Sequence, residues 1–568
     1  MPKIIIDGRE IECRAGIPVL QAALEAGRDV PYYCYHPGLS IVASCRLCLM
    51  EMKMPHPKTH ELVWAPKLFP SCQTPVRDGL EVRFDSAAVH DNQKHVMEYY
   101  LLNHPLDCPV CDKAGECYLQ DYTESVGPGT SRMVEDKLKN PKKDIGPHTL
   151  LYQDRCVLCT RCVRFCDEIA GTSELAVVNR GSRGEIDVFP GQPLANLVQG
   201  NVVDLCPVGA LLDKDFLFKQ RVWLLRSTKS VSPADSRGQT IWIDWNAEGL
   251  HRIRPRYNEK VNEWWISDEA RFGWKYVHRP DRLNQPRVRV GGTLRPESWE
   301  ALPALLRTRF ASVAAGASAS VAAGASPADV ASALPARRDR RGEPEPSPNP
   351  SLGGRGIVVV LSPMMSCEEA WLLATFIRGV APQATLVLGH VPVVGQDQTF
   401  PKGFVIKAEK CPNRRGIETI LQRLGGPTAD FRTFLGQAIE GRFNAAYVGG
   451  GYPGDWVTTD VANALAKVEL LVVHDLFPSR LDEFVAVQIP GATWAEREGT
   501  FMNCDGLLQP FDRALPPLEG VKADGQFLYE LAGRTGLFRA KKVRAELAAE
   551  MPQFAEVFMP RALPKHAH

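Results

Sequence analysis

Short apolar runs that alternate with helix-like stretches occupy the C-terminal part of the chain. They cover 357–361, 384–388, 445–448 and 470–473 and are rich in Val, Leu and Ala. Continuous apolar runs of this length, separated by helical segments, are typical of parallel strands covered by helices on both faces. Residues 356–568 are therefore predicted to form an α/β domain.

The N-terminal pattern predicts smaller elements. Residues 3–12 form two β-favouring runs around Asp7-Gly8, which is a hairpin signal. A short helix is predicted over 19–26, and Gly27 ends it. A hairpin followed by a short helix suits a small β-grasp fold.

Four further segments are distinguished by pattern and composition. A helix is predicted over 86–103 and must end before Pro105, which disfavours the helical conformation of the residue before it. The polar and basic stretch 121–149 is predicted to be a connector, and 240–256 a hairpin. Residues 311–355 are Ala/Ser/Gly repeats followed by Arg-rich and Pro-rich stretches. They cannot bury enough apolar area to order themselves, so a flexible insertion is predicted.

Composition and charge exclude several classes of protein. The chain has 568 residues, of which 44% are hydrophobic and 23% charged, and its net charge is +1. This is an ordinary globular mixture without an electrostatic case for nucleic-acid binding. No apolar run approaches the about 20 residues that span a bilayer, and the N-terminus lacks the apolar core of a signal peptide. We expect a soluble, cytoplasmic protein of several domains that reaches a membrane only through partners.

Cysteine is distributed unevenly. Thirteen of the sixteen cysteines lie between Cys13 and Cys206. Dense, closely spaced cysteine in a cytosolic chain of this size indicates metal or redox chemistry rather than disulfides. Three sets of residues have the spacing of metal ligands.

The first set is Cys34, Cys45, Cys48 and Cys72. A loop that carries three thiolates, with the fourth supplied from further along the chain, is how plant-type ferredoxins hold a [2Fe–2S] cluster. A four-cysteine zinc site is the alternative, although zinc sites usually show two close CxxC pairs and this set has one.

The second set is His104, Cys108, Cys111 and Cys117. Three thiolates leave one corner of a [4Fe–4S] cluster vacant, and His104, at the end of its predicted helix, is the nearest donor. Imidazole in place of thiolate makes the cluster one charge less negative, which changes its reduction potential. A zinc knuckle with three cysteines and one histidine is the alternative.

The third set is Cys156, Cys159, Cys162 and Cys206. A Cys-x2-Cys-x2-Cys run with a remote Cys-Pro is typical of a [4Fe–4S] site. Cys166 would help to bind a second cluster in a two-cluster ferredoxin. No other three-cysteine run exists to complete such a cluster, so Cys166 is interpreted as a bystander.

The residues around these sets have predicted roles as well. Pro207 is predicted to be the first residue of a helix, which would direct backbone N–H groups at the third cluster. Three arginines lie close to the third set in the sequence: Arg155, Arg161 and Arg164. They either add positive charge near the third cluster or are surface side chains that only solvate the loop. Cys13 is predicted to be an ordinary buried thiol within a strand.

With these three sets in order, the sequence resembles the large iron–sulfur subunit of NADH-quinone oxidoreductase, respiratory complex I. The resemblance is carried by residues 34–48, 104–117, 155–164 and 201–207. It implies a multidomain α+β and α/β protein. The implied parts are a β-grasp [2Fe–2S] ferredoxin-like domain (1–85), a one-His/three-Cys [4Fe–4S] segment (86–125), a [4Fe–4S] ferredoxin-like domain (126–220), a first molybdopterin-oxidoreductase-like domain (221–310), the insertion (311–355), and a degenerate molybdopterin-oxidoreductase-like α/β domain without molybdenum cofactor (356–568).

The same resemblance implies an electron relay and its partners. Electrons would arrive from an FMN-containing, NADH-oxidising flavoprotein subunit and leave toward quinone-reducing subunits. The protein would lie peripherally on the cytoplasmic face of the bacterial inner membrane, with no substrate site of its own. The alternative is a subunit of an NAD-linked formate dehydrogenase or a hydrogenase. The only candidates for a molybdenum ligand are Cys367 and Cys504, and neither has a recognised context.

The sequence departs from the family pattern in two places. The gap between Cys48 and Cys72 is long, and residues 54–70 are interpreted as an inserted loop. Some relatives carry an additional cluster on a Cys-x2-Cys-x3-Cys pattern at the entrance of the molybdopterin-like domain. Its cysteine positions correspond to Ser232, Asp235 and Gln239. This fourth cluster is therefore predicted to be absent.

Two C-terminal motifs complete the interpretation. Residues 498–503, with Gly506 and Gln509, resemble a segment of the molybdopterin-oxidoreductase superfamily. Residues 449–454 are glycine-rich but do not form GxGxxG between a strand and a helix, so a close-packed turn is predicted rather than a nucleotide site.

Overall fold

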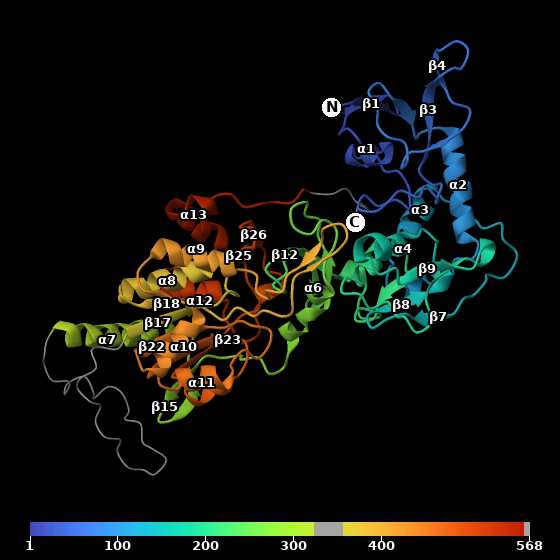
Figure 1. Cartoon of the computed structure of the whole chain (residues 1–568). Coiled ribbons are helices and arrows are strands. Elements are labelled where there is room, and N and C mark those ends of the chain that lie inside the picture. The colour runs from blue at the N-terminus through green and yellow to red at the C-terminus, as the bar shows by residue number, and fades with distance from the viewer. Residues whose placement is uncertain (323–355, 562–568) are drawn as a thin grey trace.

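The chain forms two lobes (Figure 1). This computed structural model describes residues 1–322 and 356–561. The N-terminal lobe is coloured blue to cyan and the C-terminal lobe green to red. Between the lobes, β19 (Gln398–Thr399) and β20 (Val405–Ile406) form a small hairpin whose Phe404 joins the N-terminal core. No helix in the described ranges has both the length and the apolar character needed to cross a membrane.

The chain begins with the predicted hairpin. β1 (Lys3–Ile6) pairs antiparallel with β2 (Arg9–Glu12), and Asp7 and Gly8 have φ angles of 48° and 78°. Both central residues of this type of two-residue turn require positive φ, which Asp and Gly tolerate. The short helix α1 (Val19–Glu25) follows as predicted and buries most of its side chains against the sheet.

The predicted inserted loop 54–70 is mainly a β-hairpin. β3 (Leu49–Pro55) pairs with β4 (Leu62–Trp64) at its far end and with β5 (Phe69–Pro70) at its start. β6 (Glu81–Arg83) completes the sheet in the order β2-β1-β6-β3-β4. The chain leaves the sheet along the far end of β3, turns back through β4 and returns at β5 to the start of β3 (Figure 1).

The rest of the N-terminal lobe consists of short elements around irregular loops. They are α2 (Ala87–Leu101), η1 (Cys108–Val110), α3 (Tyr118–Val126), β7 (Lys142–Asp144), β8 (Thr149–Tyr152), η2 (Gln153–Arg155), α4 (Arg161–Phe165), the π-helical turn η3 (Cys166–Ala170), β9 (Leu175–Val178), η4 (Gly181–Arg183), β10 (Glu185–Val188), α5 (Asn201–Leu205) and β11 (Leu211–Asp213). Ser86 caps α2 by accepting the N–H of Val89. The predicted connector 121–149 is only partly irregular, because α3 extends to Val126 and β7 begins at Lys142.

The prediction for Pro207 is wrong. The helix α5 ends just before Cys206, and Pro207 lies in the turn after it. Since β11 begins at Leu211, only a few residues remain after Pro207, too few for a helix. No helix N-terminus therefore faces the third cysteine set from this segment.

The C-terminal lobe begins with a small antiparallel sheet. The predicted hairpin is formed by β13 (Thr240–Asn246) and β14 (Gly249–Pro255). A third strand, β12 (Arg226–Val231), pairs with β13 and was not predicted. η5 (Val222–Leu224) precedes this sheet, and α6 (Asp268–Phe272) with η6 (Gly273–His278) follows it.

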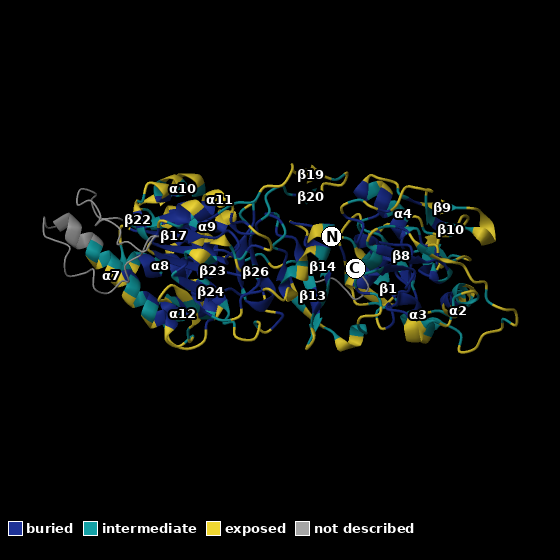
Figure 2. Ribbon diagram, turned by 90° about the horizontal axis from the view of Figure 1, so that it is seen from below, coloured by how far each residue is buried: buried dark blue, intermediate teal, exposed yellow. Residues whose placement is uncertain are grey.

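The predicted α/β domain contains an eight-stranded sheet in the order β16-β15-β24-β23-β22-β17-β18-β21. Its strands are β15 (Arg287–Val290), β16 (Thr293–Pro296), β17 (Gly356–Leu361), β18 (Thr385–Leu388), β21 (Thr428–Ala429), β22 (Phe443–Gly449), β23 (Leu470–Asp475) and β24 (Val487–Pro490). The strands from β24 to β21 run parallel, and β15 pairs antiparallel at one side. Val359 and Val360 are neighbours in β17, so their side chains lie on opposite faces of the sheet, and each belongs to a different hydrophobic core. Helices cover both faces (Figure 2).

The covering helices are α7 (Leu302–Ala322), α8 (Cys367–Val380), α9 (Arg414–Leu424), α10 (Phe431–Ile439), α11 (Thr459–Leu465), α12 (Asp524–Leu531) and α13 (Ala540–Glu550). The same part of the chain contains the short 3-10 helices η8 (Arg480–Glu483), η9 (Trp494–Glu496) and η10 (Pro552–Phe554). It also contains a hairpin of β25 (Gly499–Met502) and β26 (Leu508–Phe511). The flexible insertion predicted over 311–355 starts too early, because α7 continues to Ala322. Alanine has the highest helix propensity, which explains why this Ala-rich stretch is helical. The rest of the predicted insertion lies outside the described residues.

Candidate metal centres

The first cysteine set lies in the irregular loop that follows α1. Cys34, Cys45, Cys48 and Cys72 are all buried. The thiols of Cys45 and Cys72 hydrogen-bond to the sulfur of Cys34, and Cys72 also hydrogen-bonds to Cys48. The structure therefore brings all four sulfurs of this set together.

The hairpin of β3 and β4 explains how Cys72 reaches this set. The pairing of β5 with the start of β3 returns the chain to the side of Cys48. The hydroxyl and the N–H of Ser71 both bind the carbonyl of Cys48, at 2.7 and 3.1 Å. The long sequence gap is consequently a detour that does not displace the fourth cysteine.

The chemistry of the first set fits a cationic group. Hydrogen bonds from Cys45 and Cys72 hold the pKa of Cys34 well below its usual range. Hydrogen bonding to Cys34, followed by burial, raises the pKa of Cys45 above its usual range. Sulfurs in contact cannot all be ionised unless a positive charge lies between them. Ferric or ferrous iron supplies such a charge, and so would zinc.

The second set lies around η1 and the start of α3. Cys108 is exposed, whereas Cys111 and Cys117 are buried, and burial raises the pKa of Cys117 to about 12. A coordinated metal would be needed to keep this thiol ionised. The structure brings these three cysteines into one region, since Cys111 lies within electrostatic range of the other two.

His104 lies next to this set and is chemically suited to ligation. Burial, assisted by the cations of Arg155 and Lys137, lowers the pKa of His104 to about 4, so its imidazole is neutral at neutral pH. Its ring nitrogens accept or donate no hydrogen bond among the described residues, which leaves either one available as a donor. Neutral imidazole is the form that binds metals.

Gly209 was not singled out from the sequence, but it determines the space available to the second set. A Cβ atom placed on Gly209 would lie 2.2 Å from the sulfur of Cys111. Gly209 belongs to the turn that follows Cys206 of the third set. The turn that follows Cys206 therefore lies against Cys111 of the second set, at a position where a side chain would have no room.

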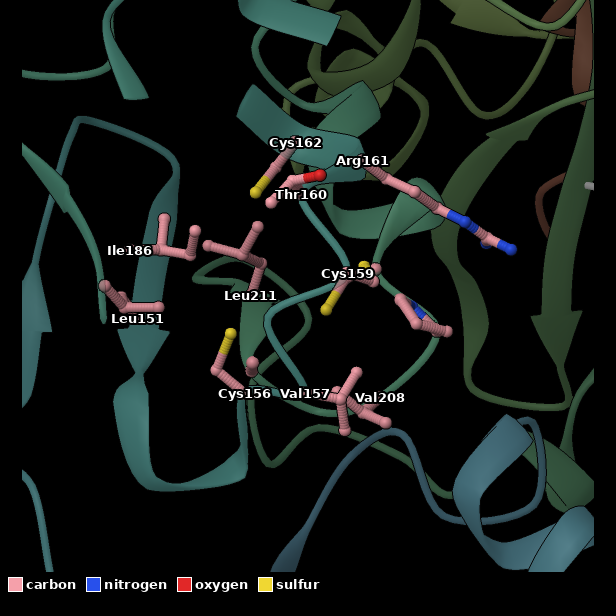
Figure 3. A pocket seen from close by; sticks show the side chains of 13 residues that line it. Leu151, Cys156, Val157, Cys159, Thr160, Arg161, Cys162, Ile186, Val208 and Leu211 are labelled. Carbon is pink, nitrogen blue, oxygen red and sulfur yellow. The ribbon is translucent and has the colours of Figure 1, made fainter. Parts of the chain in front are cut away.

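The third set lines a small, partly open cavity. The sulfurs of Cys156, Cys159 and Cys162 point into this space, opposite the apolar side chains of Leu151 and Leu211 (Figure 3). Cys206 also lines it, and the N–H of Leu158 donates to the sulfur of Cys156 at 3.3 Å. The cavity therefore offers four sulfurs and an apolar wall to one bound group.

Cys166 and Cys13 are placed elsewhere. Cys166 does not line the cavity of the third set, and its sulfur accepts the N–H of Leu175. Cys13 is buried just after β2 rather than within it, and its thiol lies 3.6 Å from the carbonyl of Pro2. Among the described residues, no three or more His, Cys, Asp or Glu side chains, those of the three sets included, are spaced around a single metal ion; the sulfurs of the first set contact one another directly instead.

The three arginines near the third set point into the protein rather than into solvent. Arg155 and Arg161 are fully buried, and Arg164 is half-buried. Arg155 pairs with Asp107 at 2.6 Å, while Arg164 donates to the carbonyl of Cys34 at 2.6 Å. These side chains therefore connect the loops of different sets, which the sequence left undecided.

A cluster of buried tyrosines fills the space between the sets. Tyr33 lies within electrostatic range of Cys45, Cys117 and Cys159, one cysteine from each set. Its N–H donates to the sulfur of Cys45 at 3.4 Å. The other rings in contact with this cluster are Tyr32, Tyr35, Tyr100, Tyr118 and Tyr122. Water is therefore excluded from the region where the three sets approach one another.

The position of the fourth cluster is closed by polar side chains. Asp235 is fully buried and accepts hydrogen bonds from the Gln239 amide and from the Lys407 N–H, both at 3.1 Å. Burial raises the pKa of Asp235 to about 6. These residues satisfy one another and offer no thiolate, so they do not fit an iron–sulfur cluster.

The C-terminal motifs have structural surroundings. Cys367 is fully buried, and its thiol donates to Asn413 at 3.2 Å. The glycine-rich turn 449–454 is close-packed, because a Cβ on Gly450 would lie about 2.2 Å from the carboxyl group of Asp475. The segment 498–503 contains β25, which is buried along its whole length and pairs with β26.

Five family models match separate parts of the chain. Their descriptions are a 2Fe-2S iron-sulfur cluster binding domain (residues 3–87), an NADH-ubiquinone oxidoreductase-G iron-sulfur binding region (93–132), an NADH-quinone oxidoreductase subunit 3 ferredoxin-like domain (146–212), an NADH-ubiquinone oxidoreductase NDSU1/NuoG-like 4Fe-4S domain (225–275) and a molybdopterin oxidoreductase (434–534). The segment that the fourth of these models matches contains no cysteine.

A relative with similarity along nearly the whole chain decides the family. This relative, the G subunit of NADH-quinone oxidoreductase from Rickettsia felis, is 31% identical over 98% of this chain and 92% of its own length. The chain belongs to the family of the large iron–sulfur subunit of NADH-quinone oxidoreductase. The fold class and the family predicted from the sequence are confirmed.

Other relatives in this family match mainly the N-terminal half. The corresponding protein of Rickettsia bellii is 42% identical over 54% of this chain but only 43% of the relative, less than half its length. The NADH-ubiquinone oxidoreductase 75 kDa subunit of Reclinomonas americana is 41% identical over 53% of this chain and 42% of its own length. These relatives are named as subunits of an oxidoreductase complex. The match to a chain of a solved NAD+-reducing [NiFe]-hydrogenase covers 39% of this chain and 91% of the hydrogenase chain, with 26% sequence identity and a TM-score of 0.33.

Proposed function

We propose that this chain is the iron–sulfur relay of an NADH:quinone oxidoreductase. The observation that carries the proposal is the arrangement of the three cysteine sets in one water-excluding lobe, where Tyr33 lies beside a cysteine of each. When bound, iron–sulfur clusters supply one-electron transfer without a change of ligand. The chain's own contribution is to hold the clusters, to fix their separation and to exclude water.

The proposed ligands are those expected from the sequence. Cys34, Cys45, Cys48 and Cys72 hold one [2Fe–2S] cluster. His104, Cys108, Cys111 and Cys117 hold one [4Fe–4S] cluster, and Cys156, Cys159, Cys162 and Cys206 hold the other. The converging sulfurs of the first set, the neutral imidazole of His104 and the four-sulfur cavity support these three assignments in turn.

We also propose that the C-terminal lobe binds no molybdenum cofactor and that a fourth cluster does not form. The thiol of Cys367 lies inside the core and is hydrogen-bonded to Asn413, which supports the first statement. The hydrogen bonds between Asp235 and Gln239 support the second. Residues 221–310 and 356–568 then act as a scaffold.

The proposed partners are other subunits of such a complex. We propose that the electrons come from an FMN-containing subunit that oxidises NADH. They leave toward quinone-reducing subunits. We propose that the chain is held peripherally on the cytoplasmic face of the inner membrane by these partners.

Substituting His104→Ala in the assembled complex tests the relay. We expect the variant to lose one cluster, about four irons per chain, while the other two cluster spectra persist. Quinone reduction by NADH should fall to background because the chain of clusters is interrupted. Electron paramagnetic resonance of the NADH-reduced complex, with quinone reduction assayed in parallel, makes the measurement. His95→Ala changes an exposed histidine of α2, the helix that ends shortly before His104, and should change neither. Three unchanged spectra in His104→Ala would show that His104 is not a ligand.

A further inference from the structure

Arg161 is a buried cation in the N-terminal lobe. Its side chain is 1% exposed. No carboxylate of a described residue lies within ion-pair distance of its guanidinium, whereas the neighbouring Arg155 is paired with Asp107. A buried charge without a counter-ion is costly, so such residues in proteins are normally paired or bind a charged group.

The guanidinium of Arg161 binds neutral groups only. One of its terminal nitrogens donates to the carbonyl of Tyr35 at 2.6 Å, and the other to the carbonyl of Leu205 at 3.2 Å. The rings of Tyr32 and Tyr118 lie 5.6 and 5.5 Å from its central carbon, within cation–π range. Its Nε has no hydrogen-bond partner. These contacts position the cation but do not neutralise it.

Three of these contacts lie next to a proposed ligand, each of a different set. Tyr35 follows Cys34, Tyr118 follows Cys117, and Leu205 precedes Cys206. The backbone N–H of Arg161 itself donates to the sulfur of Cys159. Figure 3 shows the side chain of Arg161 extending from the cavity loop away from the sulfurs of Cys159 and Cys162. It therefore reaches from the third set toward the other two.

We propose that Arg161 is the shared counter-charge of the three clusters and positions their loops relative to one another. The inference rests on the proposed function, because the compensating negative charge is that of the thiolate-bound clusters. A fixed positive charge stabilises the form that carries the additional electron, so Arg161 raises the reduction potential of all three sites.

Arg161→Gln in the purified complex tests the inference, because glutamine retains hydrogen-bonding capacity without the charge. At a fixed potential near each midpoint, we expect the ratio of reduced to oxidised cluster to fall at least tenfold, which is 59 mV for a one-electron couple. Redox titration followed by electron paramagnetic resonance measures this ratio for each cluster. Arg161→Lys should restore the wild-type potentials, since it restores the charge. Arg183→Gln makes the same chemical change at an exposed position of the same lobe and should shift none.

Two results would overturn the inference while leaving the proposed function intact. One is an Arg161→Gln complex with three clusters at wild-type potentials. If Arg161→Gln does not assemble its clusters, Arg161→Lys decides the question. Three clusters at wild-type potentials in the lysine variant support the counter-charge, and failure of the lysine variant to assemble contradicts it. The absence of three clusters in the wild-type complex would instead contradict the proposed function.

Discussion

Replacement of Gly209 by alanine should remove the second cluster. The new Cβ would lie 2.2 Å from the sulfur of Cys111, far inside the about 3.5 Å at which such atoms come into contact. Gly209 is held between β11 and Cys206, so the turn has little freedom to withdraw. The strain is relieved only if Cys111 moves away from its position beside Cys117.

The expected loss is about four irons per chain, together with the spectrum assigned to the His104 site. The [2Fe–2S] spectrum should persist, because the three atoms nearest to the new Cβ belong to Cys111, Lys113 and Arg155, none of which is in the first set. Gly129→Ala is the matched control, since a Cβ at Gly129 meets no atom within 4 Å. Iron analysis and low-temperature electron paramagnetic resonance on the two variants make the comparison. A Gly209→Ala protein with all three spectra would contradict the placement of Cys111.

Arg282→Met should produce the largest loss of stability in the C-terminal lobe. Arg282 forms two parallel hydrogen bonds, of 2.8 and 2.7 Å, with the carboxylate of Glu496. Both side chains are almost completely buried, at 1% and 4% exposure. Removing the cation leaves a buried, unpaired carboxylate, which costs about 3–5 kcal/mol.

Scanning calorimetry of the whole chain measures this effect as a fall in the transition temperature of the C-terminal lobe, about 2–4 °C per kcal/mol. The double variant Arg282→Met with Glu496→Leu should recover most of the loss, because no charge is then left unpaired. Arg442→Met is the control. Its partner Glu440 and Arg442 itself are both more than half exposed, and such pairs contribute at most about 1 kcal/mol. An Arg282→Met protein that unfolds at the wild-type temperature would show that the pair is not essential.

The cysteine spacing placed three cysteines of each set within one short stretch of chain. The spacing left the fourth members, Cys72, His104 and Cys206, as hypotheses, and all twelve ligand assignments remain predictions. It did not predict how Cys72 reaches its set, since this depends on the pairing of β5 with the start of β3. It also could not identify Gly209, whose role comes from a contact with a loop almost a hundred residues earlier.

The fold was predicted best where the apolar runs were continuous, as in β17 and β23. The strand β12 was not predicted because its sequence, Arg-Ser-Thr-Lys-Ser-Val, is almost entirely polar. It is a strand only because it pairs with β13, which is a tertiary effect. The buried position of Arg161 was unpredictable for the same reason. The residues that contact its guanidinium come from three separate segments, at Tyr32 and Tyr35, at Tyr118 and at Leu205.

Metal analysis and electron paramagnetic resonance of the anaerobically purified complex test the central claim most directly. We expect about ten irons for each copy of this chain from one [2Fe–2S] and two [4Fe–4S] clusters, with a separate spectrum for each, and neither zinc nor molybdenum in stoichiometric amount. Zinc at the three cysteine sets in place of iron, or a catalytically competent molybdopterin in the C-terminal lobe, would contradict the claim.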